Sequence, residues 1–302
     1  MDQFYDIEAT KTLLERIANE RLPRRMQLQA FKTVEGIKQY CQISHDPIAK
    51  CWRLTEHVGD ELEEAVLRFQ GVLTTKTLPP IRSPFQIEPR QRVFFRQNVT
   101  ITGLGTQASE TAVQSIDDIN EMFQRDLPQG SLEDWSPSLF DNYTAVDASN
   151  RYFTRRTDTS ADQIIPFSNM VDPDGILDAA GGEHFVHTVD NRVEYYEMIQ
   201  IGNEGISYNE INPLRFRIGD IVEAQVSFIS VPMRDRRYKM LTVLRALTVL
   251  DMSPLRNAAI ARNRYKNETI TTTVVGTLKR KVGYSKDEVE ETSEKIRRLH
   301  ID

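Results

Sequence analysis

The clearest pattern of polar and apolar positions lies between residues 216 and 251. In residues 221–228, Ile221, Glu223, Gln225 and Ser227 alternate with more apolar neighbours, which predicts a strand buried on one face. Residues 238–250 are more continuously apolar, as is typical of a strand covered on both faces. A polar turn joins the two runs, so we predict a long hairpin at the centre of an antiparallel β-barrel or sandwich.

Residues 1–73 show helical spacing instead. Asp6 suits the N-cap of a first helix that ends near Pro23, and Asp46 followed by Pro47 is a typical helix start. Apolar residues recur three and four positions apart throughout this stretch. We therefore predict an N-terminal helical bundle.

The rest of the chain divides by composition. Residues 74–92 contain four prolines and predict an extended linker. We expect a β-rich domain at 93–254 with an acidic, irregular loop insertion at 110–174, and a basic, then mixed-charge tail at 255–302. Five strands in meander order suit a small barrel, for which the oligonucleotide-binding (OB) barrel is one candidate. The predicted fold class is α+β.

Composition narrows the functional classes. The chain has 302 residues and a net charge of −6, which argues against a general nucleic-acid coat protein and leaves room for local basic patches. We expect Cys41 and Cys51 to be buried thiols without a disulfide. No secretory start and no membrane-spanning apolar run are present, so we predict an intracellular protein that does not contact membranes.

Charge is segregated along the chain. Thirteen acids face four arginines in residues 110–174, whereas eight basic residues face one acid in residues 256–286. A solvated tail, a nuclear import signal and a contact with nucleic acid or an acidic protein all fit this basic stretch. Its candidate nucleic-acid-binding residues are Arg256, Arg262, Arg264, Lys266, Lys279, Arg280 and Lys281.

His184, His187 and Asp190 form the alternative candidate site. On a helix they would share a face and suit a divalent metal. Their β-rich surroundings favour a strand, which directs the two histidines to opposite faces. We therefore predict no metal and no cofactor, and we keep a metal-dependent enzyme as the alternative function.

Residues 103–108, Gly-Leu-Gly-Thr-Gln-Ala, fit a loose dinucleotide-binding pattern. The preceding strand alternates with polar residues, and no second strand–helix–strand unit follows. We predict a glycine-kinked loop here, with nucleotide binding as the weaker interpretation.

Several segments resemble a family of uncharacterised, multi-copy proteins of mushroom-forming (basidiomycete) fungi. These segments are residues 185–191, 216–228, 239–247 and 277–284, so the resemblance covers about 172–284. It implies a fungal, intracellular protein linked to mobile elements, and it brings no activity or site residues. With the charge pattern, it leads us to predict a non-enzymatic binding protein, nuclear in location, that contacts nucleic acid or another polyanion through residues 256–281 and the barrel.

Overall fold

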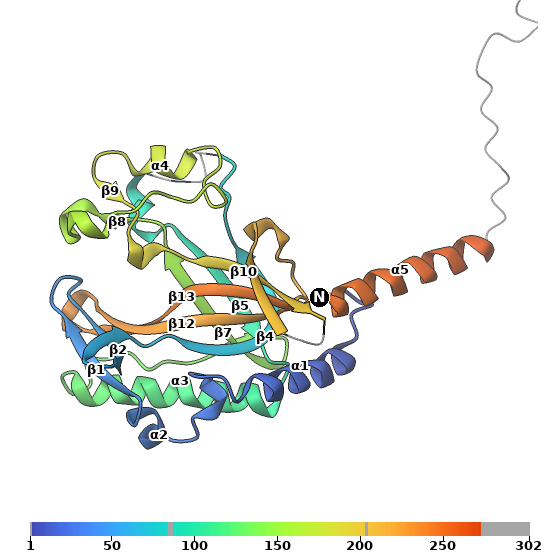
Figure 1. Ribbon diagram of the computed structural model, residues 1–302, viewed down its shortest axis with the longest axis horizontal. Coiled ribbons are helices and arrows are strands. Elements are labelled where there is room, and N and C mark those ends of the chain that lie inside the picture. Colours follow the sequence, from blue (N-terminus) through green and yellow to red (C-terminus); the bar gives the residue numbers. More distant parts are fainter. Residues whose placement is uncertain (1, 84–86, 88, 203–204, 273–302) are drawn as a thin grey trace, which may run out of the picture. The chain divides into compact units, whose positions relative to one another are not determined.

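The computed structural model describes residues 2–83, 87, 89–202 and 205–272 (Figure 1). The chain forms two compact units, Met1–Ala259 and Ile260–Asp302. Helix α5 (Ser253–Thr272) begins in the first unit and continues into the second. Every other helix and strand given below belongs to the first unit.

The centre of the first unit is a closed β-barrel. Its strands follow one another around the barrel in the order β4-β5-β7-β13-β12, and β12 pairs with β4 to close it. All neighbours are antiparallel except β7 and β13, which are parallel through the pair Val243 and Ser149. The five strands are β4 (Leu67–Thr77), β5 (Arg96–Thr102), β7 (Tyr143–Arg151), β12 (Ile221–Pro232) and β13 (Tyr238–Asp251).

Other strands extend the barrel sheet on two sides. One hairpin adds to the sheet by pairing its strand β2 with β12. A second hairpin adds by pairing its strand β10 with β13, and these two strands are parallel. The first hairpin contains β1 (Cys41–Asp46), β2 (Cys51–Val58) and the added strand β3 (Glu61–Glu64). The second contains β10 (Glu194–Ile201) and β11 (Gly205–Glu210). The remaining strands are β6 (Ser138–Phe140), which pairs with β7, and the separate pair β8 (Thr154–Arg155) and β9 (Phe185–Val186).

Helices lie outside the barrel and are capped by their local sequence. The Asp6 carboxylate accepts a hydrogen bond of 2.9 Å from the N–H of Ala9 and caps the first helix, as predicted. The α-helices of the first unit, besides the start of α5, are α1 (Ile7–Arg21), α2 (Val34–Lys38), α3 (Gln107–Asp126) and α4 (Ile176–Gly181). Short 3-10 helices are η1 (Leu28–Ala30), η3 (Pro89–Phe94), η4 (Arg156–Asp158), η5 (Ala161–Gln163), η6 (Val189–Asn191), η7 (Pro213–Arg215) and η8 (Arg234–Arg236).

Helix α3 is held tightly against the barrel. Its residues Ile116, Ile119 and Phe123 are fully buried in the main core together with the barrel interior. A Cβ atom at Gly103 would lie 1.9 Å from the Cβ of Ser109, so only glycine allows the close turn from β5 into α3. The strand before this turn is antiparallel to both of its neighbours, which supports a glycine-kinked loop and not a dinucleotide fold.

The predicted N-terminal helical bundle is wrong. Beyond α1 and the short α2, this stretch forms β1, β2, β3 and the start of the barrel strand β4. The misleading signal was Asp46 followed by Pro47. The Asp46 carboxylate accepts hydrogen bonds from the N–H groups of Ile48 (3.0 Å) and Ala49 (2.9 Å), which makes a side-chain-closed turn between β1 and β2. Aspartate before proline initiates such turns as readily as it caps helices.

Three other fold expectations need correction. The barrel is not purely antiparallel, because β7 and β13 are parallel. The strands do not pair in the expected meander order, since β9 pairs with β8 and β10 pairs with β13 and β11. The acidic segment is not an irregular insertion, because it supplies α3 and the barrel strand β7. The two cysteines are free and buried, as predicted, although they lie on strands and not on helices.

Candidate functional site

A groove lies on the face of the sheet that points away from the main core. On β12 and β13 the core-facing residues Phe228 and Leu244 are fully buried, and their neighbours at alternate positions face the groove. The groove encloses about 260 Å³. Its apolar floor consists of Ile229, Val231, Leu241 and Val243.

Arginines surround this apolar floor. They come from four different strands of the sheet, and of the described lining residues one is acidic, Asp190. The arginines are Arg53 on β2, Arg96 on β5, Arg151 on β7 and Arg245 on β13.

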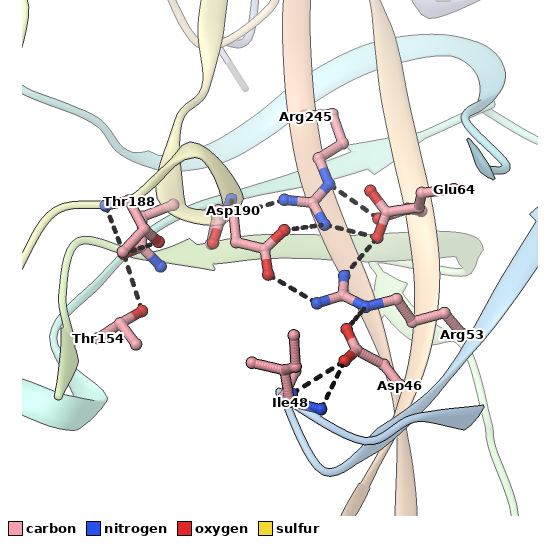
Figure 2. Close-up of polar contacts among 12 residues, drawn as sticks. Asp46, Ile48, Arg53, Glu64, Thr154, Thr188, Asp190 and Arg245 are labelled. Carbon is pink, nitrogen blue, oxygen red and sulfur yellow. Dashed lines mark hydrogen bonds and ion pairs between the residues drawn. The ribbon is translucent and has the colours of Figure 1, made fainter. Parts of the chain in front are cut away.

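Two of the arginines belong to an ionic cluster, shown in Figure 2. Arg53 reaches three carboxylates at once: Asp190 at 2.6 Å, Glu64 at 2.7 Å and Asp46 at 3.0 Å. Arg245 shares the Glu64 carboxylate at 2.7 Å and donates a 2.5 Å hydrogen bond to the backbone carbonyl of Asp190. The cluster therefore fixes both guanidinium groups and joins β2, β3 and β13 to the turn that carries Asp190.

Local turns place the two aspartates of this cluster. The turn that Asp46 closes brings its second carboxylate oxygen to Arg53. Burial alone would raise the pKa of Asp46, but hydrogen bonds from Ala49 and Arg53 outweigh it and hold the pKa below its ordinary value. Asp190 lies in η6, where the amide of Asn150 donates to its carbonyl at 2.9 Å. The Asp46 carboxylate is thus an ionised partner of Arg53 at neutral pH.

Arg96 and Arg151 differ from the two clustered arginines. They are directly opposite each other on the antiparallel strands β5 and β7, and both side chains are exposed. Arg96 donates to the Phe94 carbonyl at 3.2 Å and to the Ser149 hydroxyl at 3.5 Å. The guanidinium group of Arg151 has no hydrogen-bond or ion-pair partner among the residues that the structure describes. Like charges at directly opposite positions repel, and Asp190, the acid with the largest electrostatic effect on Arg151, is already bonded to Arg53, so the groove carries an excess of positive charge.

A larger polar cavity of about 830 Å³ adjoins the groove and shares Arg53, Arg151 and Asp190 with it. Its other wall is the segment 157–163, which presents hydroxyl groups and the carboxylates of Asp158 and Asp162. The cavity therefore has mixed charge, whereas the groove is predominantly cationic.

The structure separates the three residues of the alternative histidine site. The Nδ1 atom of His187 lies 2.9 Å from the Tyr152 carbonyl oxygen, and its ring stacks on Phe167 with centroids 4.0 Å apart. Burial lowers the pKa of His187, so its imidazole is neutral at pH 7. His184 is exposed, and Asp190 pairs with Arg53. No group of histidine, cysteine, aspartate or glutamate suited to a metal ion occurs in the described part of the chain.

The predicted basic segment is only partly described. Arg256, Arg262, Arg264 and Lys266 lie on α5, the first in one compact unit and the other three in the second. Lys279, Arg280 and Lys281 lie outside the described residues. None of the described members lines the groove.

Sequence reasoning missed the groove arginines because they are distributed over four strands without a common motif. One signal was present. Arg245 is the one charged residue within the run 240–250 of β13, and a charged residue in such a position needs either partners or a function.

No protein-family model matches this chain, and a search among curated proteins finds no match either. The resemblance to the fungal family therefore stays a prediction. Among the described helices, none combines the length with the apolar character that crossing a bilayer requires.

Proposed function

We propose that the protein is a non-enzymatic binding protein that holds a polyanion in the arginine-lined groove. The observation that carries this proposal is the directly opposed pair Arg96 and Arg151. Folding places two like charges side by side at a cost, and an anion bound between them would turn that repulsion into attraction.

Guanidinium groups suit this role. They stay protonated at any ordinary pH and present paired N–H donors that match phosphate oxygens. Arg53 and Arg245, fixed by their carboxylates, form the back of the groove. A ligand with several phosphates would bind Arg96 and Arg151 and gain from the field of the fixed pair.

Binding is favoured over catalysis by the protonation states in the groove. The guanidinium groups neither accept nor release protons at neutral pH. The carboxylate of Asp190 is engaged by Arg53 at 2.6 Å. No described lining residue therefore offers an unengaged general base.

The basic segment 256–281 remains a second predicted contact. Its charge balance supports long-range attraction of a polyanion, whereas the groove supports a defined bound geometry. The two contributions predict different behaviour on mutation, which makes them separable.

The test compares two variants of the full chain. In one, Arg96 and Arg151 are both replaced by alanine; in the other, Lys279, Arg280 and Lys281 are. Affinity for heparin, polyphosphate and a labelled oligonucleotide is measured by fluorescence anisotropy at two salt concentrations. The groove variant should lose affinity by about tenfold or more, since hydrogen bonds between charged groups contribute about 1.5–3 kcal/mol each, and its salt dependence should flatten.

Arg125→Ala is the matched control, because Arg125 is an exposed arginine on α3 outside the groove and pairs with Glu121 at 2.5 Å. It should bind like the wild type. Wild-type affinity in the groove variant together with lost affinity in the tail variant would place the site in residues 256–281. If the protein bound acidic proteins and none of the three polyanions, the proposed ligand would be a protein and not a polyanion.

A nuclear, intracellular location and a fungal mobile-element origin also belong to this proposal. They rest on the basic segment and on the fungal resemblance described above. Localisation of the fluorescently tagged full chain in fungal cells tests the first point, and exclusion of the protein from nuclei would contradict it.

A further inference from the structure

We infer that the polyanion is a single strand of nucleic acid whose bases enter the apolar part of the groove. This inference rests on the proposed function and names the ligand class of the same site. It starts from the contrast between the arginines and the floor beneath them.

The floor is too apolar for a ligand that consists of phosphates alone. Ile229, Val231 and Leu241 are partly exposed, and Val243 completes the surface between them. Covering such surface with an apolar group is favourable by about 25 cal/mol per Å², and a chain of phosphates offers no such group. Nucleobases do, because each has two flat apolar faces.

Phe94 adds an aromatic ring at the edge of the groove. Its side chain is 66% exposed, and its own carbonyl accepts a hydrogen bond from Arg96. An exposed aromatic residue beside a guanidinium that keeps N–H donors for phosphate is the combination that stacks a base and holds its backbone. Phe94 and Arg96 are therefore positioned to contact one nucleotide together.

The dimensions of the groove select an unpaired strand. A volume of about 260 Å³ admits single planar groups and not a double helix. In a duplex the base faces are already stacked on each other, and only the edges are accessible in the grooves. In a single strand the bases are free to turn outward and stack on protein side chains.

The polar groups of the groove predict little sequence preference. The Asn150 side chain is the one carboxamide among the described lining residues, and its N–H₂ group already donates to the carbonyls of Asp190 and Leu244. Stacking and apolar contact tolerate every base. We expect oligonucleotides of different composition to bind with similar affinity.

The experiment uses the full chain and three probes. These are a labelled single-stranded oligonucleotide, the same sequence as a blunt duplex, and inorganic polyphosphate as a competitor. We expect the single strand to bind at least tenfold more tightly than the duplex. Phe94→Ala should weaken single-strand binding by about tenfold, in line with the loss of one stacked base, and should leave the affinity for polyphosphate unchanged.

Leu139→Ala is the matched control, since Leu139 is an exposed apolar residue on β6 that does not line the groove. It should bind all three probes like the wild type. Because Phe94 and Leu139 are both exposed, neither substitution should prevent folding.

The outcomes separate the two proposals. Equal affinity for single strand, duplex and polyphosphate, with no effect of Phe94→Ala but a loss in the double groove variant, would overturn the single-strand inference and keep the polyanion groove. A duplex that binds as tightly as the single strand would also overturn it. No binding of any probe at low salt would overturn both.

Discussion

Two arginine clusters of this protein contrast in their access to solvent. Arg21, at the end of α1, pairs with Glu223 on β12, and their side chains are 4% and 1% exposed. The second cluster surrounds Arg53, whose side chain is 13% exposed, while that of its partner Asp190 is 47% exposed. We call them the closed pair and the open cluster.

The surroundings of the closed pair complete its isolation. Burial alone would lower the pKa of Arg21, but the hydrogen bond and charge of Glu223 outweigh it and raise that pKa. The Gln70 amide donates to the same carboxylate at 2.7 Å. Such a buried pair contributes to the stability of the fold and has almost no contact with solvent, whereas the open cluster presents charge at the surface. The same residue types therefore anchor the fold in one place and, in the proposed function, contact a ligand in the other.

The largest expected effect is on the closed pair. Glu223→Ala leaves the buried Arg21 guanidinium without its counter-ion, and we expect a loss of about 3–5 kcal/mol in the free energy of unfolding. Urea denaturation measures this. The double variant Arg21→Met with Glu223→Leu should recover most of the loss, since it removes both charges. A small effect of Glu223→Ala alone would show that water reaches the pair.

A buried carboxylate without an ion-pair partner among the described residues gives a third case. Asp220 is fully buried, and burial raises its pKa from 3.8 to about 6. At a pH between these values the folded state keeps a proton that the unfolded state releases, so stability falls as pH rises. The loss begins above about pH 4, is complete above about pH 6, and amounts to about 3 kcal/mol.

Asp220→Asn should remove this dependence. The wild type loses about 3 kcal/mol of unfolding free energy through Asp220 between pH 4 and pH 7, and the variant should not show this loss. Thermal unfolding across this pH range provides the measurement. Parallel pH profiles for the two proteins would mean that Asp220 is ionised in the folded state at little cost.

A smaller effect is expected at the open cluster. Asp190→Asn removes the one acidic group among the described groove residues, while Arg53 keeps Asp46 and Glu64. Polyanion affinity should rise severalfold, with a loss of stability of about 1 kcal/mol or less, because the carboxylate is half exposed. Glu133→Gln, at a carboxylate that pairs with Arg237 elsewhere, is the control. If Asp190→Asn bound polyanions with unchanged affinity, Asp190 would not lie near the bound ligand.

The smallest effect is expected on helix α3. Arg125 and Glu121 form an exposed pair one helical turn apart. Arg125→Ala should change the unfolding free energy by about 0.5 kcal/mol or less. Urea denaturation of Arg125→Ala and of Glu223→Ala under the same conditions compares the exposed pair with the closed pair. A loss of several kcal/mol would mean that exposure is a poor guide to the worth of an ion pair here.

The sequence predicted elements whose partners are close along the chain. β12 and β13 pair with each other across a short turn, as predicted, although β12 is buried on both faces over residues 221–224 and not on one. The sequence did not predict β4, whose partners in the barrel are β5 and the distant β12. There Leu62, Ala65 and Phe69 fit a helical period, but the structure distributes them over exposed β3, a buried loop position and β4. A short apolar run fits the period of a helix as well as that of a strand, and contacts with residues distant in sequence decide which of the two forms.

The candidate site was harder to predict for the same reason. The opposition of Arg96 and Arg151 arises from strand register between residues far apart in the chain. No local pattern carries that register, because side-chain alternation fixes the face of a strand but not its partner. The basic segment 256–281 was conspicuous only because its charges lie close together in the sequence.

The parallel contact between β7 and β13 has a consequence for synthesis of the chain. Because β13 ends at Asp251, the barrel cannot close until nearly all of the first unit has left the ribosome. Until then β4 and β7, the outer strands of the β4-β5-β7 sheet, each expose an unpaired backbone edge, and such edges are prone to pair with other chains. Closure also depends on contacts of large sequence separation, which slow folding. The nascent chain therefore carries these open edges through most of the synthesis of the first unit.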